Sequence, residues 1–271
     1  MTNQGVTIMQ IGISQLIAAD LSMEAFFHTA AEAGYEVVEL SMKAKGPLTG
    51  EATDDDLAAV VNLSRQAGLP ITSLTVGHCT GNLLDSGEAQ ERSIEQTRFG
   101  LRAAAKLGAP VILHTLGRFS ADLYYDDAYR NAVDSLTKLA VTAEELGVAI
   151  AFEFVWNGFL FSPMEVRRFL DEVNSEYVGF YFDPGNMAVF QFPQHWVRII
   201  GPHIKRVHLK DWKGRALNGE WTPLLEGEVD FRAVMSELRK TGYNGPLISE
   251  VAPSLASFAD TAKTMRTIID M

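Results

Sequence analysis

The chain contains a single cysteine, Cys79, among its 271 residues. One thiol excludes an intramolecular disulfide framework, and it excludes a metal cluster held by several thiolates. The N-terminal stretch MTNQGVTIMQ also lacks a basic region followed by an apolar one, so we do not expect a signal peptide. Together these features suit a reducing compartment, and we expect the protein to be cytoplasmic.

Long apolar runs and basic patches are absent as well. No apolar stretch approaches the ~20 residues that a helix needs to cross a bilayer, so we expect no membrane association. The 23 Lys and Arg residues are scattered, and 34 Asp and Glu residues give the chain a formal net charge of −11. Proteins that bind nucleic acid through its phosphates normally have a basic face, so we expect no nucleic-acid partner.

The chain is instead rich in short apolar runs. Hydrophobic residues make up 47% of it and charged residues 21%, which is typical of a folded protein with a large core. Eight runs are nearly continuous apolar segments, the pattern of parallel strands that are buried on both faces. They cover residues 6–14, 36–42, 70–77, 110–117, 148–154, 178–183, 204–211 and 245–251.

Amphipathic segments alternate with these runs and have the end signals of helices. Several end at a glycine, as at Gly68 and Gly108, and the pair Ser162-Pro163 is typical of a helix start. Six such helices are predicted, over residues 22–34, 54–68, 88–108, 128–147, 162–174 and 230–242.

Eight strand–helix units in a chain of this length predict a closed barrel. Each unit spans about 34 residues, the usual size of a βα unit with its loops. No linker or change of composition divides the chain, so we predict an α/β fold, a single (β/α)8 TIM barrel formed by one domain over residues 1–271. The alternative is an open, doubly wound sheet, which is disfavoured because no glycine-rich dinucleotide fingerprint follows the first strand.

Polar side chains stand at or near the C-terminal ends of the last four predicted strands, where a (β/α)8 barrel collects its functional groups. They are Glu153, Asp183, His208 and Glu250, from four successive strands and hence from one quadrant of the rim. Three converging carboxylates repel each other unless a cation is present. With one imidazole they form an oxygen and nitrogen set that suits Mn²⁺, Mg²⁺ or Co²⁺. Each residue alone has a simpler explanation, such as a helix cap, a loop ion pair or a buried histidine.

Further polar residues are expected near the same end of the barrel. His78 follows strand three and His114 lies in strand four. Three roles are open for these histidines: lining a substrate pocket, extending the metal site, or forming hydrogen bonds to neighbouring loops only. Glu39, in strand two, is either another ligand candidate or a polar residue enclosed by the barrel.

Two loops are expected to cover the barrel mouth: FVWNGFLF after Glu153 and the long LKDWKGRALNGEWTPLLEGEV after His208. Their aromatic side chains offer flat faces for sugar rings or simply pack the loops together. For their basic side chains there are two alternatives. They bind a phosphate or a hydroxyl-rich substrate, or they are solvated charges of the loop. The residues that we predict to bind substrate are His78, His114, Trp156, Asn186, Trp212 and Arg215.

The motifs at these strand ends resemble a known family. They are FEF at Glu153, FDPGN at Asp183, KRVHLKD at His208 and GPLISE at Glu250, and the stretches GYEVVEL and LEGEVDF are similar in style. The chain from about Ile11 to Glu250 resembles the xylose-isomerase-like barrel superfamily, specifically its sugar phosphate isomerase/epimerase group. These motifs are specific for the superfamily and say little about the substrate.

The resemblance to the ketose 3-epimerases of this group implies a ligand set and a catalytic pair. It implies that Glu153, Asp183, His208 and Glu250 bind a divalent metal ion, Mn²⁺ first and Mg²⁺, Co²⁺ or Zn²⁺ as alternatives, and that the two glutamates also act as acid and base. The sequence departs from those epimerases at Asn186, where they have a histidine, in WNGFLF, which lacks their acid, and at LEG, where they have Gly-x-Gly. All three departures lie near the expected substrate, not in the metal set.

The sequence therefore predicts a metal-dependent isomerase or epimerase that abstracts a proton next to the carbonyl of a sugar, sugar phosphate or polyol. A metal-dependent lyase or dehydratase acting on a keto-sugar or inosose is the alternative. An apurinic endonuclease is disfavoured by the acidic charge and by Asn186, and a non-catalytic sugar-binding barrel by the two glutamates. The expected partner is a small carbohydrate, and a homo-oligomer remains possible.

Overall fold

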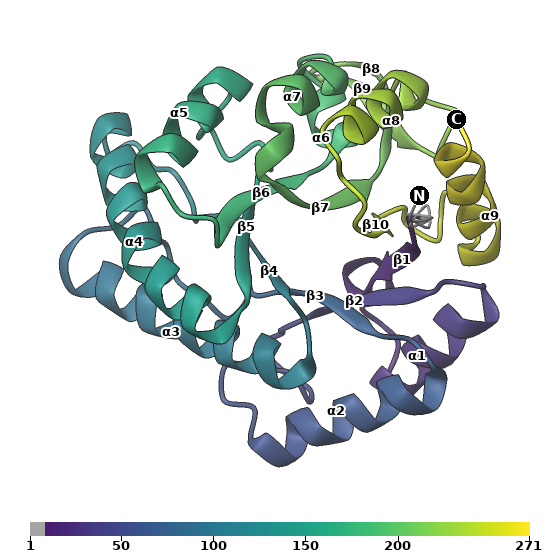
Figure 1. Ribbon diagram of the computed structural model, residues 1–271, viewed down its shortest axis with the longest axis horizontal. Coiled ribbons are helices and arrows are strands. Elements are labelled where there is room, and N and C mark those ends of the chain that lie inside the picture. Colours follow the sequence, from purple (N-terminus) through teal and green to yellow (C-terminus); the bar gives the residue numbers. More distant parts are fainter. Residues whose placement is uncertain (1–8) are drawn as a thin grey trace, which may run out of the picture.

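The computed structural model describes residues 9–271, which form a closed barrel of parallel strands surrounded by helices (Figure 1). Within these residues the barrel has eight strands: β1 (Ile11–Ser14), β2 (Val37–Ser41), β3 (Ile71–Thr75), β4 (Val111–His114), β5 (Ala149–Glu153), β6 (Val178–Phe182), β7 (Ile204–Leu209) and β10 (Leu247–Ser249). Their order around the barrel is β1-β10-β7-β6-β5-β4-β3-β2, which confirms the predicted (β/α)8 TIM barrel. The first part of the predicted strand 6–14, like the start of the predicted domain 1–271, lies outside the described residues.

The strands are buried on both faces, as their apolar sequences predict. Every residue of β1, β2, β4 and β6 is buried. Because successive side chains of a strand point to opposite faces, Phe180 of β6 stacks on Trp196 in the surrounding helices, whereas Tyr181 reaches across the barrel to Glu39. The helix-facing side of the sheet is therefore apolar, and the enclosed side has polar groups.

All six predicted helices are present: α1 (Met23–Glu32), α2 (Asp54–Ala67), α3 (Gly87–Leu107), α4 (Tyr125–Leu146), α5 (Pro163–Val173) and α8 (Phe231–Lys240). Gly68 and Gly108 end their helices in the left-handed conformation, and the Ser162 hydroxyl accepts a hydrogen bond from the Glu165 N–H. Helix α4 begins three residues earlier than predicted, with Asp126 and Asp127 in its first turn, where negative charge is favourable.

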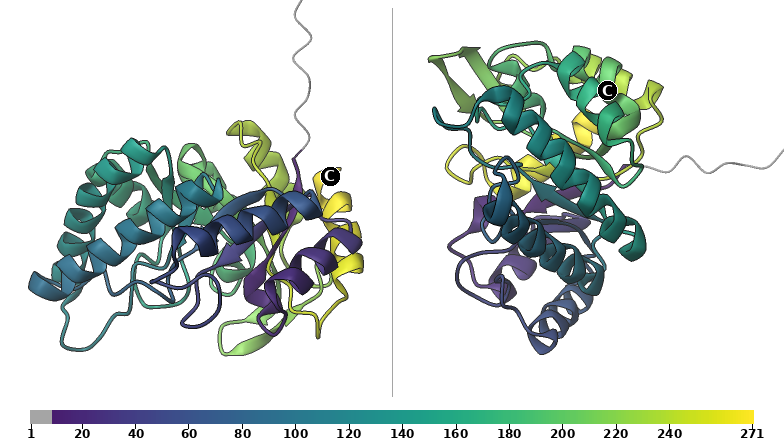
Figure 2. Two further views of the ribbon diagram at one scale, coloured as in Figure 1. Left: turned by 90° about the horizontal axis from the view of Figure 1, so that it is seen from below. Right: turned by 90° about the vertical axis from the view of Figure 1, so that its left-hand side faces the viewer.

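Several elements were not predicted from the sequence. They are the helices α6 (Pro184–Ala188), α7 (Pro193–Ile200) and α9 (Phe258–Ile269), the short 3₁₀ helices η1 (Gln15–Ala18) and η2 (Gly201–His203), and an antiparallel hairpin of β8 (Asp211–Arg215) and β9 (Asn218–Thr222). The hairpin occupies most of the long segment after His208 that was expected to be a loop over the barrel mouth. It projects from one face of the molecule (Figure 2).

The buried carboxylate of Asp211 holds the base of this hairpin. It accepts hydrogen bonds from the backbone N–H groups of Leu225, Gly227 and Val229, at 2.9 to 3.1 Å. A Cβ atom at position 227 would lie 2.1 Å from Asp211 Oδ1, so only glycine fits there. The side chain of Asp211, the first residue of the hairpin, thus fixes the LEGEV stretch that follows the hairpin.

Within residues 9–271, no helix combines the length and the apolar character needed to cross a membrane.

Candidate active site

The four predicted metal ligands come together at the C-terminal end of the barrel. Glu153 ends β5, Asp183 follows β6, His208 lies in β7 and Glu250 follows β10. One potential ligand atom from each of the four lies within 4.8 Å of those of the other three. Asp183 and His208 are fully buried, and the side chain of Glu250 is 15% exposed. The fold thus assembles one compact group from residues nearly 100 positions apart in the chain.

Asp183 is at once a helix cap and a member of this group. Its Oδ1 accepts a hydrogen bond of 3.0 Å from the Asn186 N–H, and Pro184 begins α6 directly after it. Pro184 and Gly185 therefore form the start of α6. The cap fixes the carboxylate and leaves Oδ2 facing the other members of the group.

His208 is oriented by Glu39 inside the barrel. The imidazole Nε2 lies 2.8 Å from Glu39 Oε1, while Nδ1 faces Glu153 Oε1 at 3.4 Å and Glu250 Oε2 at 3.6 Å. With Nε2–H donating to Glu39, Nδ1 can act as a ligand, an arrangement common among metal-binding histidines. Burial opposes protonation of His208, but the charges of Glu39 and Glu250 outweigh it and raise the histidine pKa.

Glu39 is itself held in place by hydroxyl groups. Ser73 Oγ donates to Glu39 Oε2 at 2.8 Å, and the Tyr181 hydroxyl donates to the same oxygen. Burial raises the pKa of Glu39, but the charge and hydrogen bond of His208 outweigh it and the net direction is downward. The sequence left Glu39 as either a metal ligand or a polar residue enclosed by the barrel. The structure favours the second, and here the enclosed carboxylate positions His208, a candidate ligand.

Lys210 adds an ammonium to the group. Its Nζ lies 2.9 Å from Asp183 Oδ2 and 2.6 Å from Glu250 Oε2, and it sits 5.0 Å from the centre of the Trp221 ring. Burial lowers the pKa of Lys210, but the charges of Asp183 and Glu250 outweigh it and raise the pKa. Gly185 is needed here, because a Cβ atom at that position would lie 2.6 Å from Lys210 Cβ.

The group fits a divalent cation. Asp183 Oδ2 and Glu250 Oε2 are buried and accept no hydrogen bond of normal geometry within residues 9–271, although the Lys210 ammonium is close to both. Three carboxylates share the site with a single ammonium and an imidazole, so a further positive charge would stabilise them. The donors are oxygen and imidazole nitrogen, which suit Mn²⁺, Mg²⁺, Co²⁺ or Zn²⁺.

The carboxyl group of Glu153 is buried and has a shifted pKa. Burial raises its pKa to about 7, against the opposing effect of the His208 hydrogen bond. The side-chain amide of Asn186 donates to Glu153 Oε1 at 3.1 Å and to the Phe154 carbonyl at 3.0 Å. Asn186, predicted to bind substrate, thus also orients a candidate acid/base residue.

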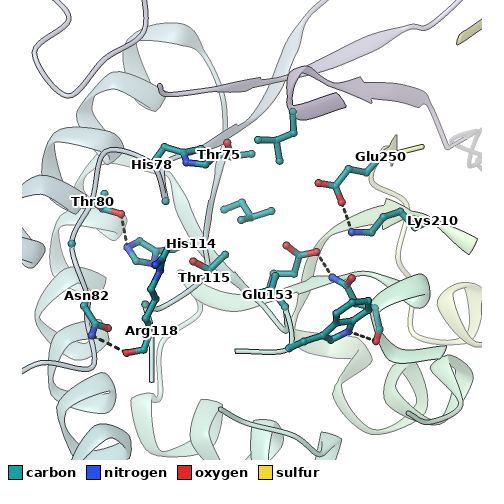
Figure 3. Close-up of a pocket in the computed structure, with 18 residues that line it drawn as sticks. Thr75, His78, Thr80, Asn82, His114, Thr115, Arg118, Glu153, Lys210 and Glu250 are labelled. Atoms are coloured by element: carbon teal, nitrogen blue, oxygen red, sulfur yellow. Dashed lines mark hydrogen bonds and ion pairs between the residues drawn. The ribbon is translucent and has the colours of Figure 1, made fainter. Parts of the chain in front are cut away.

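A cavity of about 630 Å³ opens beside the group and contains Glu153, Glu250 and Lys210 in its wall (Figure 3). Of the residues predicted to bind substrate, His78, His114, Trp156 and Asn186 line this cavity. Trp212 and Arg215 are not among its lining residues. Trp212 is 8% exposed and packs edge-on against Trp221, and Arg215 is exposed and pairs with Glu228 at 2.8 Å.

His114 lines the cavity, but its two ring nitrogens are engaged by the protein. Nδ1 accepts a hydrogen bond of 2.9 Å from the Leu116 N–H, and Nε2 lies 3.0 Å from Thr80 Oγ1. Burial lowers the pKa of His114 to about 4. The neutral ring therefore serves mainly to join the loops after β3 and β4.

The tryptophans join two loops at the cavity rim. Trp156 stacks on Trp221 with ring centres 5.3 Å apart and an angle of 2° between the planes, and its Nε1 donates to the Asn186 carbonyl at 2.9 Å. The loop after β5 is thereby fixed to the β8–β9 hairpin. Trp156 is 39% exposed, so it still offers an apolar surface to the cavity.

The sequence-based predictions omitted several cavity residues, including Thr80, Asn82 and Arg118. These follow β3 and β4, and the strand-end rule that identified Glu153 and Asp183 applies to them too. They were missed because loop residues of mixed polarity have no distinguishing pattern.

The fold and the site define a (β/α)8 barrel with a mixed carboxylate and histidine group at the C-terminal ends of its strands. The chain belongs to the xylose isomerase-like TIM barrel family, whose model matches residues 27–268.

Comparison with known proteins agrees with this assignment. The chain is 24% identical over 241 residues to the L-ribulose-5-phosphate 3-epimerase of Escherichia coli, covering 82% of this chain and 79% of that one. Its structure is similar to that of a D-tagatose 3-epimerase-like protein, with a TM-score of 0.81, 18% identity and 97% of each chain covered. It is also similar to the 3-keto-D-glucoside 4-epimerase of E. coli, with a TM-score of 0.78, 20% identity, and 96% and 99% of the two chains covered.

Proposed function

We propose that the protein is a metal-dependent isomerase or epimerase that acts on a sugar, sugar phosphate or polyol. The observation that supports this most directly is that Glu153 and Glu250 belong to the metal-binding group and also line the cavity. Two carboxylates in one cavity can exchange a proton with the same substrate carbon. The relatives named above, a ribulose-phosphate 3-epimerase and a ketoglucoside 4-epimerase, are named for reactions of this kind.

The proposed ligands of the metal are Glu153, Asp183, His208 and Glu250. Mn²⁺ is the proposed ion, with Mg²⁺, Co²⁺ and Zn²⁺ as alternatives. When bound, the ion supplies a Lewis acid that polarises a carbonyl and its neighbouring hydroxyl and lowers the cost of an enediolate.

The protein's own residues move the proton. One of the two glutamates takes the proton from the carbon next to the carbonyl, and the electron pair of the broken C–H bond moves to the carbonyl oxygen. The other glutamate returns a proton on the opposite face, which inverts the carbon. Glu153 suits either role near neutrality, because burial raises its pKa to about 7. Asn186 holds its carboxylate in place, and the Lys210 ammonium beside Glu250 can donate a hydrogen bond to the developing oxyanion.

Proton abstraction is expected to be measurable as deuterium exchange. The purified protein, loaded with Mn²⁺, would be incubated in deuterated water with D-tagatose, D-psicose, L-ribulose 5-phosphate and related keto-sugars. We expect deuterium at the carbon next to the carbonyl of at least one sugar, detected by mass spectrometry and NMR. Loss of water from that sugar would indicate the lyase alternative. A metal-loaded protein that exchanges no proton across the panel contradicts the proposal.

We also expect no cleavage of DNA. The formal net charge of −11 disfavours binding to a phosphate backbone. The measurement is nicking of a duplex with one abasic site, in the presence of Mn²⁺, Mg²⁺ or Zn²⁺, with a known abasic endonuclease as positive control. Efficient nicking would replace the carbohydrate function with a nuclease function.

A further inference from the structure

The acidic side chains of the cavity lie on one side of it, together with Lys210. The acids that line it, Glu153 and Glu250, both belong to the metal-binding group. Figure 3 shows His78 and Arg118 on the opposite side of the cavity, and among the described residues no aspartate or glutamate lines that side. A substrate that spans the cavity therefore meets a metal-binding group at one end and basic side chains at the other.

The guanidinium of Arg118 has no partner within residues 9–271. The residue is held through its backbone carbonyl, which accepts a hydrogen bond of 3.0 Å from Asn82 Nδ2, and its exposed side chain makes no ion pair or hydrogen bond there. Arg98, Arg130 and Arg167 each pair with an acid on their own helix. The exposed Arg65, Arg102 and Arg198 have no side-chain partner in the described part of the chain either, so it is the cavity position that distinguishes Arg118. His78 likewise makes no side-chain hydrogen bond or ion pair in the described part of the chain.

The backbone that presents Arg118 is fixed on two sides. Asn157 Nδ2, from the loop after β5, donates to the carbonyls of Thr115 and Gly117 at 3.2 and 3.0 Å. Asn82, from the loop after β3, holds the carbonyl of Arg118. Three carbonyls of one short loop thus bind side-chain amides from its two neighbours. The free side chain therefore projects from an anchored backbone.

The same loop adopts backbone conformations that are costly unless the surroundings impose them. Leu116 has a φ of 63°, in the left-handed region that leucine rarely adopts. Gly117 has a φ of 135°, and a Cβ atom there would lie 1.7 Å from Asn82 Oδ1. Backbone strain of this kind is concentrated at functional sites. Leu160, Leu217 and Leu225 outside the cavity have similar φ angles, so the strain shows how firmly this loop is held and does not by itself assign a role.

We propose that His78 and Arg118 form a subsite for an oxyanion, a phosphate ester or carboxylate, at the end of the substrate remote from the reacting carbonyl. This inference rests on the proposed function, which assigns the carbonyl to the metal-binding side. A guanidinium binds two oxygens of either anion with parallel, charge-assisted hydrogen bonds. The imidazole of His78 adds an N–H donor in either protonation state. The substrate class is therefore an anionic sugar.

The test measures binding of inorganic phosphate and of D-gluconate to the metal-free protein by isothermal calorimetry, at matched ionic strength. Omitting the metal removes a second site for anions. Arg118→Gln and His78→Gln are each expected to raise the dissociation constant, Arg118→Gln by about tenfold or more, because hydrogen bonds to a charged group are lost. Arg102→Gln is the control, since Arg102 is an exposed arginine on α3 that does not line the cavity. Thermal melts check that each variant folds.

Each outcome decides the inference. Phosphate binding that weakens in the two cavity variants and not in Arg102→Gln supports a phosphate ester, and the same pattern for D-gluconate alone supports a sugar acid. No binding of either anion, or binding unchanged by Arg118→Gln, overturns the subsite. Because this assay measures no turnover, a failed deuterium screen contradicts the proposed function and leaves the binding result interpretable.

Discussion

Glu153→Gln and Glu250→Gln are each expected to lower turnover by ~10²–10⁴-fold at saturating metal, the usual contribution of general acid–base catalysis. An amide cannot accept the substrate proton, although it can still provide an oxygen to a metal ion. If the two glutamates were ligands alone, excess Mn²⁺ would restore activity. The measurement is turnover and deuterium exchange for both variants at several Mn²⁺ concentrations, on whichever sugar the wild-type protein exchanges.

A matched control and a contrasting outcome complete this experiment. Glu88→Gln makes the same change at a side chain on α3 that is 96% exposed, and it is expected to retain wild-type turnover. An epimerase needs both glutamates, yet either single variant can still exchange the proton from one face of the substrate. A lyase needs only one as base. Near wild-type turnover in both variants would rule out the proposed proton transfer, whatever happens to the metal.

Removing the metal is expected to lower the melting temperature by ~5 °C or more. A ligand present at 100 times its dissociation constant stabilises the native state by about 2.7 kcal/mol. Each kcal/mol shifts the melting temperature of a chain of this size by roughly 2 °C or slightly more. The physical source is the group of three carboxylates at the strand ends, which repel each other less when a divalent ion lies among them. Elemental analysis should give about one ion per chain.

Two variants separate the metal from other sources of stability. Asp183→Asn keeps a side chain that can cap α6, but it removes one charged ligand and should abolish most of the metal-induced shift. Glu39→Gln leaves the four ligands intact and removes the carboxylate that orients His208, so metal affinity is expected to fall by roughly 10–100-fold. A protein that contains no metal as purified, and whose melting temperature does not respond to added Mn²⁺, would contradict the assignment of this site.

The sequence alone determined the barrel and the core of the candidate site. A strand buried on both faces has a local signature, because every residue along it must be apolar, and the run VGFYF is entirely buried as β6. The end of α2 at Gly68 and the start of α5 at Ser162 also have local sequence signatures, because a cap depends on the residue and its immediate neighbours. Glu153 and Asp183 could be grouped because closure of a parallel barrel brings consecutive strand ends together.

Only the tertiary structure decided what the remaining polar residues do. Glu39 and His208 are 169 positions apart, and nothing in either strand predicts which would be the ligand and which the support. The stretch after the hairpin took its position because Asp211 binds backbone N–H groups 14 to 18 residues away. Arg118 and Arg215 look alike in sequence, yet one lines the cavity and the other pairs with Glu228 on the surface. The physical reason is the same in each case: the free energy that selects a side chain's position in a loop comes from partners distant in the chain, and those partners are known only once the barrel has closed.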